Sequence, residues 1–161
     1  MRVCLLLAVC AGFMGLSEAD DTKAKEVKFD QATGYFESNK SGLTGEASYL
    51  AFADQEGFLK VLRPTPPLMG KKPNLLPKDA FQKNVVVAVI KRGDTIWKYT
   101  VDKVTAQTGT LTIEYKAAQQ GAGGGTAKFA SPMVVAVEKA DYKEVVFIEN
   151  GKKAGTAKIG K

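Results

Sequence analysis

The sequence contains no histidine, and this absence excludes several kinds of chemistry at once. Histidine is the commonest general base in enzymes and the commonest metal ligand, and every Ser-His-Asp triad requires it. The chain has 2 cysteines, Cys4 and Cys10, both close to its first residue. No serine lies in a Gly-x-Ser-x-Gly or Ser-x-x-Lys motif, and no Asp-x-Asp-x-Asp-Gly calcium loop is present. We therefore expect no catalytic residue, metal site or cofactor. The one hydrolase alternative is a catalytic Ser–Lys pair whose two residues are brought together by the fold.

Apolar runs long enough to cross a membrane are also lacking, although one short run lies near the first residue. Arg2 precedes an apolar segment at 3–14, and the small residues Ser17 and Ala19 suit a signal-peptide cut after Ala19. The segment is shorter than the roughly 20 residues of a membrane-spanning helix. We interpret 1–19 as a secretory signal peptide and expect an exported protein, periplasmic or secreted. Because Leu7 to Cys10 resembles a lipobox with an unusual valine before the cysteine, we expect membrane association only if Cys10 is lipidated.

Negative charge is in the minority, since 17 Asp and Glu stand against 23 Lys and Arg, for a net charge of +6. An excess of positive charge favours anionic partners but says nothing about the fold. Aromatic side chains do not alternate with the lysines, so the stacking surface that single-stranded nucleic acid requires is missing. We expect no nucleic-acid partner and keep a basic surface that binds anionic polymers as the alternative function.

Strand patterns dominate the chain after the charged segment at 20–28. Residues 85–90 form an unbroken apolar, mostly β-branched run, which is typical of a strand buried on both faces. Trp97, Tyr99 and Val101 alternate with polar residues, as in a half-buried strand. We expect strands at 27–29, 33–36, 47–53, 85–90, 97–101, 111–115, 133–137 and 144–148.

The helix content expected from the sequence is small. Asp54 is a suitable N-cap for one short helix at 55–62, which the prolines from Pro64 onward end. Residues 107–109 suit a hairpin turn between two strands. Because strands do not alternate with helices, a parallel α/β fold is disfavoured. We predict one mainly β domain at 20–161, an antiparallel sandwich or partly open barrel with one short helix, in which 20–26 and 150–161 are flexible.

Two loops, proline-rich at 63–73 and glycine-rich at 121–128, are the segments that we expect to contact a partner, together with an unprotected strand edge. The glycine-rich loop lacks the Gly-Lys-Ser/Thr of a phosphate-binding loop and precedes a strand, so we interpret it as a connection. The integrin-type tripeptide at 92–94 has the composition of a turn, and we interpret it as one. The alternation of Trp97 with polar residues predicts that its side chain lies in the core. The alternative interpretation is that Trp97 is exposed and anchors a partner. The predicted partner-binding residues are Arg63, Pro66, Trp97, Gly123 and Gly124.

The order of these elements resembles the C-terminal domain type of the protease-complex subunit PrcB. The resemblance covers about 41–137 and depends on Asp79-Ala80-Phe81 before the 85–89 strand and on Ala130-Ser131-Pro132 before the 133–137 strand. Its motifs are strand patterns of moderate specificity. The family usually has Gly-Gly before the tyrosine, whereas this chain has Trp97-Lys98 before Tyr99, which puts a shared binding edge in doubt.

The resemblance implies an exported domain without catalytic residues, which in one relative is associated with a surface protease and supports it. We therefore predict a non-enzymatic, exported protein-interaction domain, with an envelope or extracellular protease as the implied partner. The alternatives are a binder of anionic polymers and a small hydrolase.

Overall fold

The computed structural model describes residues 23–66, 73–122 and 128–160. The predicted signal peptide at 1–19, with the lipobox cysteine Cys10, lies outside the described residues. Among the described residues, no helix is long and apolar enough to span a membrane.

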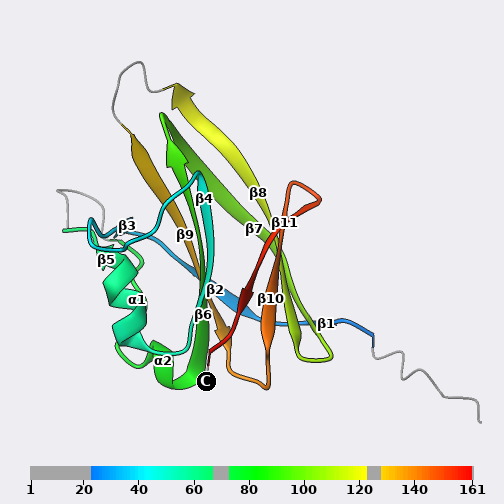
Figure 1. Cartoon of the computed structure of the whole chain (residues 1–161). Coiled ribbons are helices and arrows are strands. Elements are labelled where there is room, and N and C mark those ends of the chain that lie inside the picture. The colour runs from blue at the N-terminus through cyan, green and yellow to red at the C-terminus, as the bar shows by residue number, and fades with distance from the viewer. Residues whose placement is uncertain (1–22, 67–72, 123–127, 161) are drawn as a thin grey trace, which may run out of the picture.

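Eleven strands and two short helices make up the described part of the chain, in one five-stranded, one four-stranded and one two-stranded sheet (Figure 1). The strand orders are β1-β7-β8-β10-β11, β2-β9-β6-β4 and β3-β5, and the pairs are antiparallel except for the parallel pair β8–β10. The predicted fold class, mainly β with little helix, is confirmed. The strands are β1 (Lys25–Glu26), β2 (Phe29–Ala32), β3 (Tyr35–Glu37), β4 (Ala47–Phe52), β5 (Leu62–Pro64), β6 (Asn84–Gly93), β7 (Thr95–Gln107), β8 (Thr110–Ala122), β9 (Phe129–Glu138), β10 (Glu144–Glu149) and β11 (Lys152–Lys158), and the helices are α1 (Gln55–Val61) and α2 (Ala80–Lys83).

The central strand β6 is buried on both faces, as its apolar run predicts. Side chains alternate along a strand, so Val85, Val87 and Val89 enter an inner core between the two large sheets. Val86 and Ala88 point the other way, into an outer core beneath α1. The predicted turn after β7 is also confirmed, and its left-handed backbone is typical of a two-residue hairpin loop.

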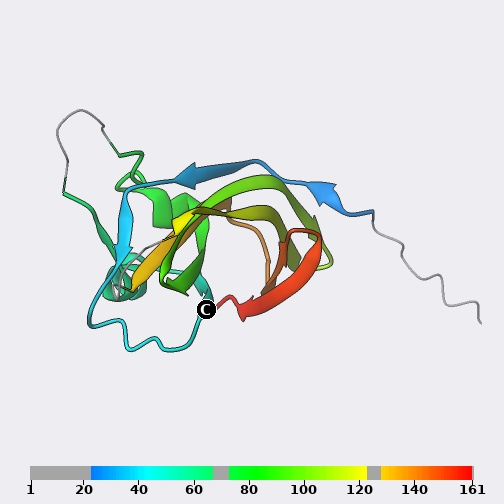
Figure 2. The ribbon, with the colours of Figure 1, turned by 90° about the horizontal axis from the view of Figure 1, so that it is seen from above.

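The N-terminal segment connects the two large sheets at one side. β1 pairs with β7, β2 pairs with β9, and between them the Val27 N–H donates to the Val104 carbonyl at 2.9 Å. On the other side, β4 and β11 are the edges of their sheets and touch without being paired. The view from above shows the resulting ring of strands, which is a partly open barrel with a seam between β4 and β11 (Figure 2).

The predicted short helix and its cap are both present. The Asp54 carboxylate accepts a hydrogen bond from the Gly57 N–H at 2.8 Å, which caps the start of α1. Phe58 on this helix is buried, and its ring makes edge contacts with Tyr35 and Phe52. The helix therefore closes the outer core over the four-stranded sheet. The single turn α2, just before β6, was not expected from the sequence.

Two segments that the sequence predicts to be flexible are paired strands. Residues 152–158 form β11, which pairs with β10 along its length, and 25–26 form β1 on the edge of β7. Partly buried Ala157 and Ile159 pack against the inner core from the tail. Small residues among the lysines let the tail lie against the core, so its Gly/Lys-rich composition is not a sign of fraying here.

Candidate interaction face

The two-stranded sheet β3–β5 forms a small platform beside the four-stranded sheet (Figure 1). Its register places Phe36 opposite Arg63 and Tyr35 opposite Pro64. The Tyr35 ring makes an edge contact with Phe58 of α1, with 5.1 Å between ring centroids. Because neighbouring side chains on a strand point to opposite faces, Phe36 and Arg63 share the face that is turned away from α1, and both are exposed.

A largely buried ion pair connects this platform to β6. Arg92 donates from Nε and Nη2 to the two carboxylate oxygens of Glu37, at 2.7 and 2.8 Å. The Arg92 Nη1 also donates to the Ser48 hydroxyl at 3.0 Å, and the Ser41 hydroxyl donates to Glu37 at 2.7 Å. The side chains of Arg92 and Glu37 are only 17% and 10% exposed. A two-pronged pair of this kind sets both distance and orientation, so β3 is held firmly.

The same contacts keep Glu37 ionised. Burial by itself would raise the pKa of this carboxyl, but the hydrogen bonds from Arg92 and Ser41 and the Arg92 charge outweigh it. The pKa of Glu37 therefore lies below its ordinary value. Glu37 is consequently committed to Arg92 and adds no free negative charge to the platform.

Two exposed phenylalanines line a surface depression that Glu37 and Arg92 also line. Phe36 is 43% exposed and Phe129, at the start of β9, is 36% exposed. Both line a depression of about 450 Å³, together with Leu43, Arg92 and Lys128. Exposed aromatic and arginine side chains are enriched in protein–protein interfaces. We call the surface formed by Phe36, Arg63, Lys128 and Phe129 the Phe36–Phe129 face.

The structure brings only part of the predicted partner-binding set to this face. Arg63 belongs to it, and Pro66 is exposed just after β5. Trp97 does not belong to it, because its half-buried ring packs against the inner core and Lys91 Nζ lies 3.7 Å from its centroid. Gly123 and Gly124 lie outside the described residues.

Phe36 and Phe129 were missed by sequence reasoning. Phe36 reads as an ordinary strand residue, and Phe129 follows the glycine-rich loop without any motif of its own. Only the pairing of β3 with β5 and the approach of β3 to β9 bring the two rings to one depression.

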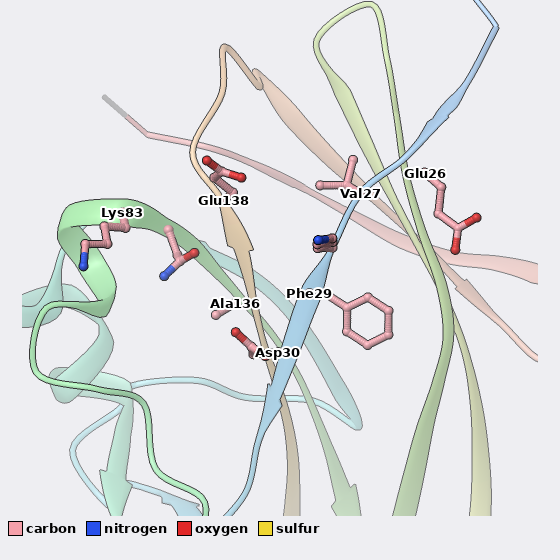
Figure 3. Close-up of a pocket in the computed structure, with 9 residues that line it drawn as sticks. Glu26, Val27, Phe29, Asp30, Lys83, Ala136 and Glu138 are labelled. Atoms are coloured by element: carbon pink, nitrogen blue, oxygen red, sulfur yellow. The ribbon is translucent and has the colours of Figure 1, made fainter.

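A second depression lies at the other end of the four-stranded sheet, between β1–β2, α2 and the end of β9 (Figure 3). It has a volume of about 840 Å³ and carries charges of both signs. Glu138 and Asp30 line it beside Lys83, which is already paired with Asp79 at 2.6 Å. Figure 3 shows Phe29 turned toward β7 and β8, where it packs against the inner core. Figure 3 shows Lys83, Glu138 and Asp30 apart from one another in this groove.

A polar cluster inside the barrel connects the two large sheets. Lys91 of β6 reaches Glu149 of β10 at 2.6 Å, and the Tyr115 hydroxyl donates to the other Glu149 oxygen at 2.9 Å. Burial, followed by the hydrogen bond to Glu149 and its charge, raises the pKa of Tyr115. Each charged group in the cluster has a partner, which is the arrangement expected of a structural contact across a core.

Metal binding has no support in the described ranges, where no three acidic, cysteine or histidine side chains gather closely enough to hold an ion. Comparison of the chain with protein-family models, curated proteins and solved structures gave no match. The resemblance to the PrcB domain type therefore stays a prediction.

Proposed function

We propose that this protein is a non-catalytic, exported domain that binds another protein through the Phe36–Phe129 face. The observation that carries the proposal is the pair of exposed phenylalanines that share one depression on separate strands. The strand that carries Phe36 is held in place, because the Glu37–Arg92 pair joins β3 to β6. A rigid surface loses little conformational freedom on binding, which favours affinity.

The proposed partner class is an envelope or extracellular protease. The support for this choice is the resemblance of 41–137 to a domain type that, in one relative, accompanies a surface protease. The role would be support or positioning of the enzyme by surface complementarity.

The alternative, a binder of anionic polymers, has a weaker basis in the structure. Exposed lysines without carboxylate partners among the described residues lie on several elements, such as Lys98 of β7 and Lys152 of β11. Polymer binding by dispersed lysines would be weak and strongly dependent on salt.

Co-purification from the native host tests the proposal. The full chain, exported with a C-terminal tag, is compared with the double variant Phe36→Ser/Phe129→Ser, and the extract is washed at low and high salt. We expect one protein in near-stoichiometric amount with the native chain, resistant to high salt, and its loss with the double variant.

Leu75→Ser is the matched control, because Leu75 is 39% exposed and lines a different depression with Tyr35 and Pro64. It should retain the partner. A mixed set of acidic material that elutes with salt, from native and variant chains alike, would contradict the proposal and favour the polymer alternative.

A further inference from the structure

We infer that the Phe36–Phe129 face recognises an acidic peptide segment that carries a large apolar side chain. The inference rests on the proposed function and names the chemistry of its partner. Three features of the face carry it: the free cations, the committed carboxylate and the apolar lining.

The first feature is unbalanced positive charge. Arg63 and Lys128 are exposed and have no carboxylate partner within the described residues. Lys128 lines the depression with both phenylalanines, whereas Arg63 lies outside that lining. Arg63 is the direct cross-strand neighbour of Phe36. A guanidinium beside an aromatic ring can hold a carboxylate with two parallel hydrogen bonds.

The second feature is the state of the one acidic residue that lines the depression. Glu37 is engaged on both oxygens by Arg92 and receives a further bond from Ser41. Its charge is therefore already balanced and does not repel an incoming carboxylate. Among the described residues that line the depression, Lys128 is therefore the charged group without an opposite partner, and Arg63 adds a second such cation next to Phe36.

The third feature distinguishes a peptide from a simple polyanion. Leu43 and Ala130 join the two phenylalanines in lining the depression. An apolar side chain placed there would remove these surfaces from water, which a phosphate or sulfate polymer cannot do. Charge and apolar lining together therefore fit acidic residues that flank an aromatic or large aliphatic side chain.

The test uses three synthetic peptides against the purified protein, followed by amide chemical shifts in NMR titrations. The probe is Gly-Asp-Glu-Phe-Glu-Asp-Gly. One comparison peptide replaces the phenylalanine by serine, and the other replaces all four acidic residues by lysine. We expect the probe to shift the amide signals of residues around Phe36 and Phe129. Each comparison peptide should bind at least about tenfold more weakly than the probe, a factor that corresponds to about 1.4 kcal/mol.

Charge reversal on the face provides the matched variants. Arg63→Glu should lower the affinity for the probe by about tenfold or more. Lys152→Glu, a charge reversal on β11, should leave the affinity for the probe unchanged. The amide spectrum of each variant, with unperturbed peaks away from the mutation, verifies the fold. Three results would overturn the inference. Arg63→Glu could bind the probe as tightly as the native protein does, or the native protein could bind the serine peptide as tightly as the probe. The third result is that no peptide shifts the amide signals of the face.

The co-purification test separates this inference from the proposed function. If Arg63→Glu/Lys128→Glu still captures the partner while Phe36→Ser/Phe129→Ser does not, the face binds a protein but the acidic partner class is wrong. If both double variants capture the partner, the face itself is not the binding site. Inorganic polyphosphate that shifts the face as strongly as the probe would also overturn the acidic-peptide inference.

Discussion

Arg92 and Glu37 illustrate how two residues can make a binding surface possible. The β3–β5 sheet has three residues in each strand, and an isolated two-stranded ribbon of this length is not stable in water. The ion pair connects it to β6, a strand of the four-stranded sheet that is buried over six consecutive residues, 85–90. Removal of one partner from such a pair is costly, because the other charge then stays in a poorly hydrated position.

We therefore expect Arg92→Met to lower the free energy of unfolding by about 3 kcal/mol in urea titrations. Lys60→Met is the matched control, since Lys60 pairs with Glu56 at 2.9 Å on the exposed side of α1. The control should leave the midpoint essentially unchanged. In the double variant Glu37→Gln/Arg92→Met, the loss should be smaller than the sum of the two single losses.

The loss of stability in acid is a second measure of the Glu37–Arg92 pair. Because the pKa of Glu37 is lowered in the folded state, its stabilising effect is complete above the ordinary value of 4.5 and is lost as the pH falls through the folded pKa. The native protein should therefore lose stability below about pH 4.5 more steeply than Glu37→Gln. Parallel acid profiles for the two proteins, or additive losses in the double variant, would show that the pair does not act as described.

At the scale of the elements, the seam between β4 and β11 is the place where the two large sheets meet by packing and not by strand pairing. Gly155 of β11 lies directly against the ring of Tyr49 of β4, and a Cβ atom at this glycine would overlap the ring. Tyr49 in turn packs against Phe147, with 5.4 Å between ring centroids. The ring therefore has no free space to retreat into the inner core.

We expect Gly155→Ala to destabilise the protein by about 1–3 kcal/mol and to disturb amide signals along β4 and β11 first. Gly160→Ala is the control, because a Cβ atom there meets nothing within 4 Å. Thermal unfolding together with hydrogen exchange measures both effects. An equal response of the two variants, or protection lost evenly over all strands, would contradict a seam held by this contact.

The elements also show which parts of the fold can be predicted from the sequence. The runs in β6 and β9 and the Asp54 cap are local signals, and each is confirmed by the structure. The β11 strand was missed, although Asn150-Gly151 between β10 and β11 is a strong signal for a hairpin turn. The glycines and lysines of 150–161 favour a flexible tail on composition alone, which carries no information on the pairing of β11 with β10.

The candidate face could be predicted only in part, for a physical reason. The proline-rich loop predicts Arg63 as a partner-binding residue, and this stays a prediction. Phe36 and Phe129 line one depression only because segments far apart in the sequence lie together in the fold. Local composition carries no information on such pairings. The same limit applies to Trp97, whose pattern predicts the inner core but not its contact with Lys91.

At the scale of the whole molecule, the barrel holds its tyrosines in the neutral form. The chain has 5 tyrosines, and the pKa of each one is raised, with burial as the largest cause in every case. The Glu149 charge raises the pKa further for Tyr49, Tyr99 and Tyr115, which lie on three different strands. The inner core and the partly buried carboxylate of Glu149 therefore act together on tyrosines from both large sheets.

We expect the native protein to show less tyrosinate absorbance at pH 10 than the unfolded chain, which is half ionised at that pH. A raised folded pKa means that stability is complete below pH 10 and is lost as the pH rises above it, because only the unfolded chain then releases these protons. Urea titrations at pH 8 and pH 11, roughly one unit or more on either side of pH 10, should show this loss of stability.

Tyr115→Phe is the discriminating variant: it removes one of the 5 tyrosines, so the total absorbance change of the unfolded chain falls by one fifth. The native titration near pH 10 should stay as it was, because Tyr115 does not ionise there. Two results would contradict exclusion of the tyrosinate form by the core. One is a native tyrosinate absorbance that rises with pH as it does in the unfolded chain. The other is a native absorbance near pH 10 that is lower in Tyr115→Phe than in the native sequence.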